Sequence, residues 1–221
     1  MNVDFKQHHK PTFDNIPKEK KKRIIDVATK EFAKNGYHDA SISAIASKSG
    51  ISVGAVYKYF ENKQDLFLTI VDEGIHRMEN MLLGLAQEDV DVIIKVEKIL
   101  REIIKASREE SILLKLYNSM TAINDDKLAR QFAKEMETVT SEIYIEAIRE
   151  GQKTGEVRAD IDPQIAAWLI DDLFMSLQFS YAGNYYSERY KVYCGDDITE
   201  KDEYVIAEVL KFIKSALKTE K

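Results

Sequence analysis

The sequence predicts an all-α fold of about nine helices. Only 9 Gly and 3 Pro interrupt the 221 residues, so the chain offers few of the turns that separate short strands. Leu, Ile, Ala, Glu and Lys, which favour helices, are frequent, and apolar residues recur with helical spacing. No segment shows the apolar–polar alternation of a half-buried strand.

The first four helices are predicted after a polar, unpatterned segment, residues 1–16, that we expect to be a flexible tail. Apolar residues at helical spacing, such as Ile24, Ala28 and Phe32, mark one face of the first helix. Ser41, Ser52 and Asn62 are expected N-caps, and Gly at 36 and 50 is expected to end helices. The predicted helices are 17–35, 41–49, 52–60 and 62–85, the last connecting to the rest of the chain.

The larger remainder, residues 86–221, is predicted to form a helical bundle. Asp162 followed by Pro163 is a cap with a proline in the first turn, and Thr199 is a second expected cap. The predicted helices are 91–107, 110–121, 125–152, 163–186 and 200–218.

Charge is unevenly distributed along the chain, whose net charge is −6. Residues 17–63 hold ten Lys or Arg and five Asp or Glu, a net charge of +5, while residues 1–16 are neutral and the rest carries −11. A basic segment on an acidic body is typical of a protein that binds a polyanion with one domain. A chance asymmetry is the alternative that charge alone leaves open.

The chain has one cysteine, Cys194, which cannot form a disulfide within the chain. The longest apolar run, Ile165 to Ile170, is far shorter than the ~20 residues that span a bilayer. The first residues also lack the apolar core of a signal peptide. We therefore expect a cytoplasmic protein with no membrane segment.

Residues 42–60 read as a short helix, a tight turn and a second short helix. Ile45 and Ala46 are apolar because short helices are stable only when packed on a third, and Gly50 permits the sharp turn. In a helix-turn-helix the second helix lies in the major groove of DNA; a hairpin that only packs is the alternative. The DNA-contacting candidates are Ser41, Lys48, Ser52, Val53, Gly54, Ala55, Tyr57, Lys58, Tyr59 and Lys63.

The side chains of the second helix suit different parts of DNA. Gly54 and Ala55 allow close approach to base edges. Lys58 suits a guanine edge or a phosphate, whereas the hydroxyls of Tyr57 and Tyr59 suit phosphates. Tyr57, Lys58 and Tyr59 are expected to be exposed if Val53, Val56 and Phe60 form the buried face of this helix.

An ordered set of residues extends this motif in both directions. It reads Ile25-x-x-Ala28-x-x-x-Phe32-x-x-x-Gly36-Tyr37, Ser41-x-x-x-Ile45-Ala46, Gly50-Ile51-Ser52-x-Gly54-x-Val56-Tyr57-x-Tyr59-Phe60 and Lys63-x-x-Leu66. The stretch from Lys18 to Leu66 thereby resembles the DNA-binding domain of the tetracycline-repressor (TetR) family. It departs from the family where Ser41 replaces the commoner Thr and where Lys48 precedes Ser49-Gly50 instead of Ala-Gly.

The resemblance implies a homodimer with a DNA-binding head (17–62) and an effector-binding and dimerisation domain (86–221). Family members pair through their last two long helices, which by position would be 163–186 and 200–218. The first of these is apolar nearly all round, which favours burial on two sides, although a central helix of a monomeric bundle would show the same pattern.

A pocket for a small-molecule effector is expected among central helices that combine apolar bulk with polar groups; plain core is the alternative. Asp171 and Asp172 point about 100° apart on a helix and cannot form a facing acid–base pair, but one of them is a candidate for a polar spot in the pocket or the dimer seam. The pocket candidates are Tyr117, Met120, Trp168, Phe174, Met175 and Gln178.

No other chemistry is indicated by the sequence. His8, His9, His38 and His76 are scattered, so no metal site is expected, and no phosphate loop, dinucleotide fingerprint or catalytic elbow occurs. We therefore predict a protein that is not an enzyme, needs no cofactor and represses transcription from a palindromic operator in double-stranded DNA until an unknown effector releases it. An effector-blind DNA-binding dimer and an all-helical enzyme are the alternatives.

Overall fold

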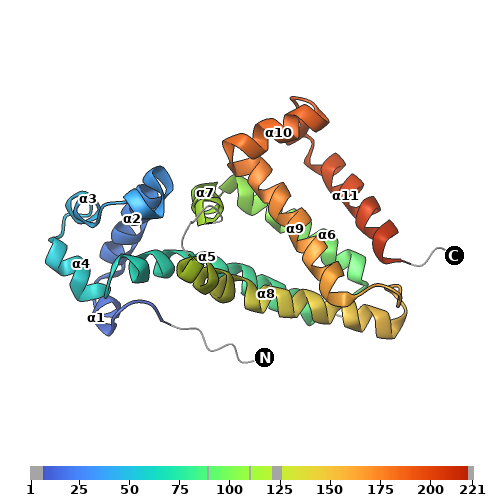
Figure 1. Cartoon of the computed structure of the whole chain (residues 1–221), viewed down its shortest axis with the longest axis horizontal. Coiled ribbons are helices and arrows are strands. Elements are labelled where there is room, and N and C mark those ends of the chain that lie inside the picture. Colours follow the sequence, from blue (N-terminus) through green and yellow to red (C-terminus); the bar gives the residue numbers. More distant parts are fainter. Residues whose placement is uncertain (1–6, 89, 110, 121–125, 219–221) are drawn as a thin grey trace. The chain divides into compact units, whose positions relative to one another are not determined.

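The structure is a computed structural model that describes residues 7–88, 90–109, 111–120 and 126–218. All regular structure in these ranges is helical, as predicted (Figure 1). The chain divides into two compact units, residues 1–77 with 115–132 and residues 78–114 with 133–221; we call them the N-terminal and C-terminal units.

The helices begin and end close to their predicted positions, with α1 and α10 as additional ones. They are α1 (Pro11–Asp14), α2 (Lys18–Asp39), α3 (Ile42–Lys48), α4 (Val53–Tyr59), α5 (Lys63–Ala86), α6 (Val92–Glu109), α7 (Ser111–Met120), α8 (Asp126–Thr154), α9 (Pro163–Ala182), α10 (Asn184–Cys194), the 3-10 helix η1 (Ile198–Glu200) and α11 (Asp202–Leu217). The described residues therefore hold more helices than the nine expected.

The N-terminal unit is organised around the apolar stripe of α2. Ile24 and Phe32 of this helix are fully buried, as are Ile45 of α3, Phe60 after α4 and Phe67 of α5. Two short helices gain their stability from such packing on a third. α2 continues to Asp39 across a kink at Gly36, whose φ of 73° is accessible to glycine without strain.

Of the predicted flexible tail, residues 1–16, the described part from residue 7 onward belongs to this unit and is not a loose tail, and residues 1–6 lie outside the described residues. From residue 7 the chain is described; it forms α1, which packs on α4. Phe13 of α1 is buried, with ring centroids 5.7 Å from Tyr59 and 4.8 Å from Phe60. The buried Phe13 ring and its packing on two aromatic rings help to hold this short segment in place.

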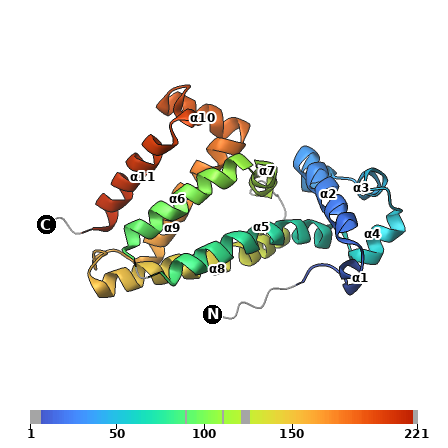
Figure 2. The ribbon, with the colours of Figure 1, turned by 180° about the vertical axis from the view of Figure 1, so that it is seen from behind.

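The C-terminal unit contains α9, α10 and α11, and α6 packs on both α9 and α11 (Figure 2). Asp162 caps α9 as predicted, because its carboxylate accepts hydrogen bonds from the backbone N–H groups of Gln164 and Ile165, both at 2.9 Å. The predicted helix 163–186 ends earlier, at Ala182, and the chain turns at Gly183 into α10. The predicted cap Thr199 lies inside η1, and α11 starts after Lys201.

Ion pairs fasten both ends of α11 to α6. Arg101 pairs with Glu203 and Arg108 with Asp202, each at 2.6 Å. At the other end, Lys218 pairs with Asp91 at 2.8 Å. α6 and α11 are thereby held antiparallel. Within the described ranges, every helix is too short or too polar to span a lipid bilayer.

Candidate DNA-binding surface and C-terminal groove

The geometry of α3, the turn and α4 follows from local hydrogen bonds. Ser41 accepts a hydrogen bond from the backbone N–H of Ala44 at 3.3 Å, and Ser52 accepts one from that of Ala55 at 3.1 Å, so both predicted N-caps are confirmed. Gly50 takes a φ of 68°, which lets the chain reverse between the two helices. Both Ser hydroxyl oxygens therefore accept hydrogen bonds from the backbone of the protein itself.

One face of α4 is open to solvent. Tyr57 is 46 % exposed, and Gly54 and Lys58 are exposed beside it. Val53, expected on the buried side, is 38 % exposed, because residues four apart share a helix face and Val53 precedes Tyr57 by four. The exposed face of α4 therefore combines one cation, one hydroxyl and two small or branched apolar groups.

Tyr59 was expected to be exposed, and that expectation is wrong. Its side chain is only 6 % exposed, since it follows the buried Val56 by three residues and lies on the same side of α4. Its ring packs against Phe13, and its hydroxyl accepts a hydrogen bond from the Nζ of Lys20 at 3.2 Å. Tyr59 belongs to the core of the N-terminal unit.

Two of the predicted phosphate-binding lysines have partners within the N-terminal unit. The Nζ of Lys48 lies 2.6 Å from the carboxylate of Glu31, a side chain that is almost fully buried. This contact lowers the pKa of Glu31. The Nζ of Lys63 donates to the carbonyl of His38 at 2.8 Å and lies over the ring of Tyr37.

The segment before α2 binds the carboxyl end of α4, a feature that the sequence analysis missed. The backbone N–H of Lys10 donates to the carbonyl of Tyr59 at 2.8 Å, and its Nζ donates to that of Tyr57 at 3.0 Å. The hydroxyl of Thr12 donates to the carbonyl of Lys58 at 2.5 Å. These carbonyls have no partner inside a helix, so the segment satisfies the end of the helix that presents Tyr57 and Lys58.

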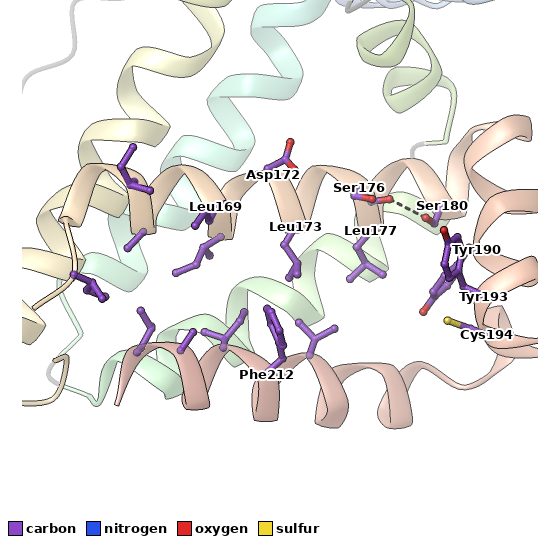
Figure 3. A pocket seen from close by; sticks show the side chains of 18 of the residues that line it. Leu169, Asp172, Leu173, Ser176, Leu177, Ser180, Tyr190, Tyr193, Cys194 and Phe212 are labelled. Carbon is purple, nitrogen blue, oxygen red and sulfur yellow. Dashed lines mark hydrogen bonds between the residues drawn. The ribbon is translucent and has the colours of Figure 1, made fainter. Parts of the chain in front are cut away.

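A groove of about 890 Å³ lies between α9 and α11, with α10 at one end (Figure 3). Leu169, Leu173 and Leu177 of α9 lie along one side, and Phe212 of α11 lies on the other. Three of its side chains are more than half exposed: Ile165 at 57 %, Leu169 at 55 % and Phe212 at 67 %. Its polar end is formed by α10 and the end of α9, with Ser180, Arg189, Tyr190, Tyr193 and Cys194.

None of the six predicted pocket residues lines this groove. Tyr117 and Met120 fall in the N-terminal unit, Trp168 is 62 % exposed and Phe174 is buried in the C-terminal core. Met175 and Gln178 are half-buried on α9. An effector pocket at these positions stays a prediction.

The interior of the C-terminal unit also contains polar groups. Asp171 of α9 is largely buried, and burial together with Glu137 and Asp172 raises its pKa to about 6. Tyr144 of α8 lies 6.1 Å from Phe174, ring to ring. Among the residues that the structure describes, no three His, Cys, Asp or Glu side chains gather closely enough to hold a metal ion.

Comparisons with known proteins match both the motif and the fold. Residues 24–70 match the model of a family described as bacterial regulatory proteins, tetR family. The fatty acid metabolism regulator protein of Bacillus subtilis is 26 % identical over 162 residues, 67 % of this chain and 76 % of that protein. The family match includes the whole of α4 and its exposed face.

Solved structures of similar fold extend over nearly the whole chain. The transcriptional regulator FadR from Bacillus subtilis, in complex with stearoyl-CoA, has a TM-score of 0.73 at 22 % identity and covers 88 % of this chain and 98 % of its own. SmeT, the repressor of the Stenotrophomonas maltophilia multidrug efflux pump SmeDEF, has a TM-score of 0.67 at 18 % identity and covers 94 % of this chain and 93 % of its own.

Proposed function

Because this chain belongs to the tetR family of bacterial regulatory proteins, we propose that it is a repressor that binds DNA as a homodimer and leaves it when a small-molecule effector binds. The exposed face of α4 is the observation that carries the proposal. It presents Tyr57 and Lys58 on a helix whose other side is buried, which is how a recognition helix reaches a major groove.

The chemistry of this face suits DNA. Lys58 contributes a cation for a guanine edge or a phosphate, Tyr57 a hydroxyl for a phosphate, and the Val53 side chain an apolar surface for a thymine methyl. Ala55 is only half-buried and Gly54 adds no side chain, so the helix backbone can approach base edges. Tyr59 is not part of this surface, and Lys48 and Lys63 contribute mainly through their contacts in the protein.

The groove between α9 and α11 supports a dimer. An isolated chain leaves Leu169, Phe212 and Ile165 more than half exposed, and an exposed apolar patch of this kind marks an interaction surface. In a two-fold dimer the same patch of each chain is buried against the other chain. We place the partner's α9 and α11 against this groove; a pair of chains would carry two copies of α4, the number that an inverted repeat requires.

The DNA-binding surface is tested with single substitutions measured by fluorescence anisotropy on duplexes that the protein selects from a random pool. Selected duplexes should contain an inverted repeat. Lys58→Ala and Tyr57→Ala should each weaken binding by about tenfold or more, and Lys58→Ala should reduce the salt slope by about 1. Lys105→Ala, which removes an exposed cation from α6, is the matched control; equal losses in all three variants would remove α4 from the interface.

The dimer is tested by light scattering after gel filtration. Leu169→Glu with Phe212→Glu should convert a dimer into a monomer and abolish operator binding, because charges would be buried in the seam. Ile94→Glu alters an apolar residue of α6 that is 45 % exposed and should leave the dimer intact. A double variant that stays dimeric would place the seam elsewhere.

The comparisons leave the effector open. The FadR structure is in complex with stearoyl-CoA, whereas SmeT is described only as the repressor of a multidrug efflux pump, which names no ligand. The chemical class has to be inferred from the residues of the C-terminal unit. An effector-blind dimer stays the alternative, and it predicts that no small molecule changes operator affinity.

A further inference from the structure

The helix α10 packs on α9, but none of its own side chains is buried. Its inner side is held by aromatic contacts. The ring centroid of Tyr186 lies 5.4 Å from that of Phe179, and the ring centroid of Tyr190 lies 6.5 Å from that of Tyr181. The opposite side of α10 therefore faces solvent in the isolated chain.

This outer side carries the kinds of side chain that proteins place in interfaces. Tyr185, Val192 and Tyr193 are each at least 75 % exposed. The guanidinium carbon of Arg189 lies 5.1 Å from the centroid of the Tyr193 ring. Residues spaced by three or four positions share one side of a helix, and we call these four residues the α10 stripe. Tyr and Arg are enriched in protein interfaces and in their hot spots.

The α10 stripe continues the groove between α9 and α11. Arg189 and Tyr193 belong to both, and Figure 3 shows Tyr193 beside Cys194 at one end of the groove. A stable protein interface takes about 20–30 residues from each partner. A partner large enough to cover the exposed Leu169 and Phe212 therefore reaches the rim of the groove, where the α10 stripe lies.

The charges at the two ends of the groove favour a second copy of this chain as that partner. Arg189 lies at the end formed by α10, and Asp162 lies at the other end, where α9 begins. Both side chains are exposed, and neither forms an ion pair with any residue that the structure describes. One oxygen of Asp162, Oδ1, accepts both hydrogen bonds that cap α9, so Oδ2 is available to a cation.

Two-fold symmetry brings these opposite charges together. An axis that crosses the middle of α9 reverses the partner's groove, so that the basic end of each groove meets the acidic end of the other. Such a pairing uses one contact twice, as an isologous interface requires. A nucleic acid is a poorer occupant, because the residues after 63 carry a net charge of −11.

We propose that the α10 stripe is part of the dimer interface and that Arg189 forms an ion pair with the partner's Asp162. The inference rests on the proposed function, since it extends the seam that we place between α9 and α11. It adds a third helix to that seam and fixes which ends of the two chains meet.

The stripe is tested by sedimentation velocity on a dilution series of the full-length protein. Tyr185→Ser and Tyr193→Ser should each raise the dissociation constant of the dimer by about tenfold or more. Lys191→Ala removes another cation of α10, whose partner is Glu188 of the same helix, and should leave the constant unchanged. Wild-type constants in both tyrosine variants would overturn the proposal and leave the stripe to a different protein.

The ion pair is tested by a double-mutant cycle. Arg189→Ala removes the cation, and Asp162→Ser removes the carboxylate while keeping an oxygen that can cap α9. Each should weaken the dimer, and the double variant should be no weaker than the weaker single variant, because both changes break the same contact. Losses that add in the double variant would show that the two side chains do not pair.

The chain's only cysteine separates failure of this inference from failure of the proposed function. Cys194 is the last residue of α10, lines the groove and is exposed in the isolated chain. Its alkylation by iodoacetamide, followed by mass spectrometry, should be several times slower in the wild-type dimer than in the Leu169→Glu, Phe212→Glu monomer. Equal rates would overturn the inference while the dimer stands; a double variant that stays dimeric would contradict the proposed seam itself.

Discussion

The ring of Phe13 lies 4.8 Å from the ring of Phe60, the residue that ends the exposed helix α4. This contact joins α1 to the helix that we propose to read DNA. It lies beside the three hydrogen bonds from Lys10 and Thr12 to the last carbonyls of α4. The position of α4 thus depends on a segment that carries none of its DNA-contacting side chains.

Phe13→Ala should destabilise the N-terminal unit and weaken operator binding. Removal of a buried Phe side chain costs about 3–5 kcal/mol, and the loss should also loosen the end of α4. Urea unfolding and operator anisotropy measure the two effects. Phe13→Leu keeps apolar bulk and should recover most of both; an alanine variant with wild-type stability would show that α1 is not anchored by Phe13.

Ser49→Ala should stabilise the protein. Ser49 is fully buried at the end of α3, and its hydroxyl has no hydrogen-bond partner. Replacement by Ala removes an unsatisfied polar group and leaves little space, so we expect a gain of about 1 kcal/mol in the free energy of unfolding. Ser47→Ala, an exposed change on the same helix, is the control and should be neutral; a loss of stability in Ser49→Ala would mean that water satisfies the hydroxyl.

Lys48→Ala should lower the free energy of unfolding, whereas Lys58→Ala should leave it unchanged. Lys48 is the cation beside the buried carboxylate of Glu31, and its removal leaves that charge unpaired at a cost of roughly 1–2 kcal/mol. The lowered pKa of Glu31 means that its stabilising contribution is present above its ordinary value of 4.5 and is lost as the pH falls below it.

Urea unfolding at pH 7 and at pH 3.5 checks this assignment. The difference between wild type and Lys48→Ala should be largest at pH 7 and smaller at pH 3.5, because that pH lies below the ordinary pKa of 4.5, where the contribution of Glu31 is being lost. Lys58→Ala should match the wild type at both values. If the wild type and Lys48→Ala differ by the same free energy of unfolding at both pH values, Lys48 does not stabilise the protein through its contact with Glu31.

Local signals in the sequence predicted the fold and the helix that presents the site. Ser41, Ser52 and Asp162 act as the caps that their side chains indicate, and Gly50 takes the positive φ that its place between two helices requires. These features depend on residues within a few positions of one another, which a sequence displays directly.

Contacts between distant residues were not predictable in the same way. The burial of Tyr59 depends on Phe13 and Lys20, respectively 46 and 39 positions earlier in the chain. Lys48 is a plausible phosphate ligand until Glu31 is placed beside it. Pro11 and Phe13 within a polar run were the available signal for α1, since an isolated aromatic residue beside a proline is consistent with a short anchored turn.

Asp171→Asn should stabilise the free protein at neutral pH. The folded-state pKa of Asp171 is about 6, above its ordinary value of 3.8. A raised pKa means that the favourable contribution is fully present below 3.8, where the group is protonated in both states, and is lost as the pH rises through about 6. Above that pH the folded protein holds a charge that burial and the neighbouring carboxylates disfavour.

The magnitude is limited by the partial exposure of this carboxyl group, whose charge solvent screens in part. At pH 7.5 the free energy of unfolding of the Asp171→Asn variant should be about 1–2 kcal/mol higher than that of the wild type. At pH 4 the difference should be much smaller. Urea unfolding at these two values, with Glu142→Gln, a change of an exposed carboxylate on α8, as the control, measures the difference. An advantage that is the same at both pH values would show that the folded protein does not raise the pKa of Asp171.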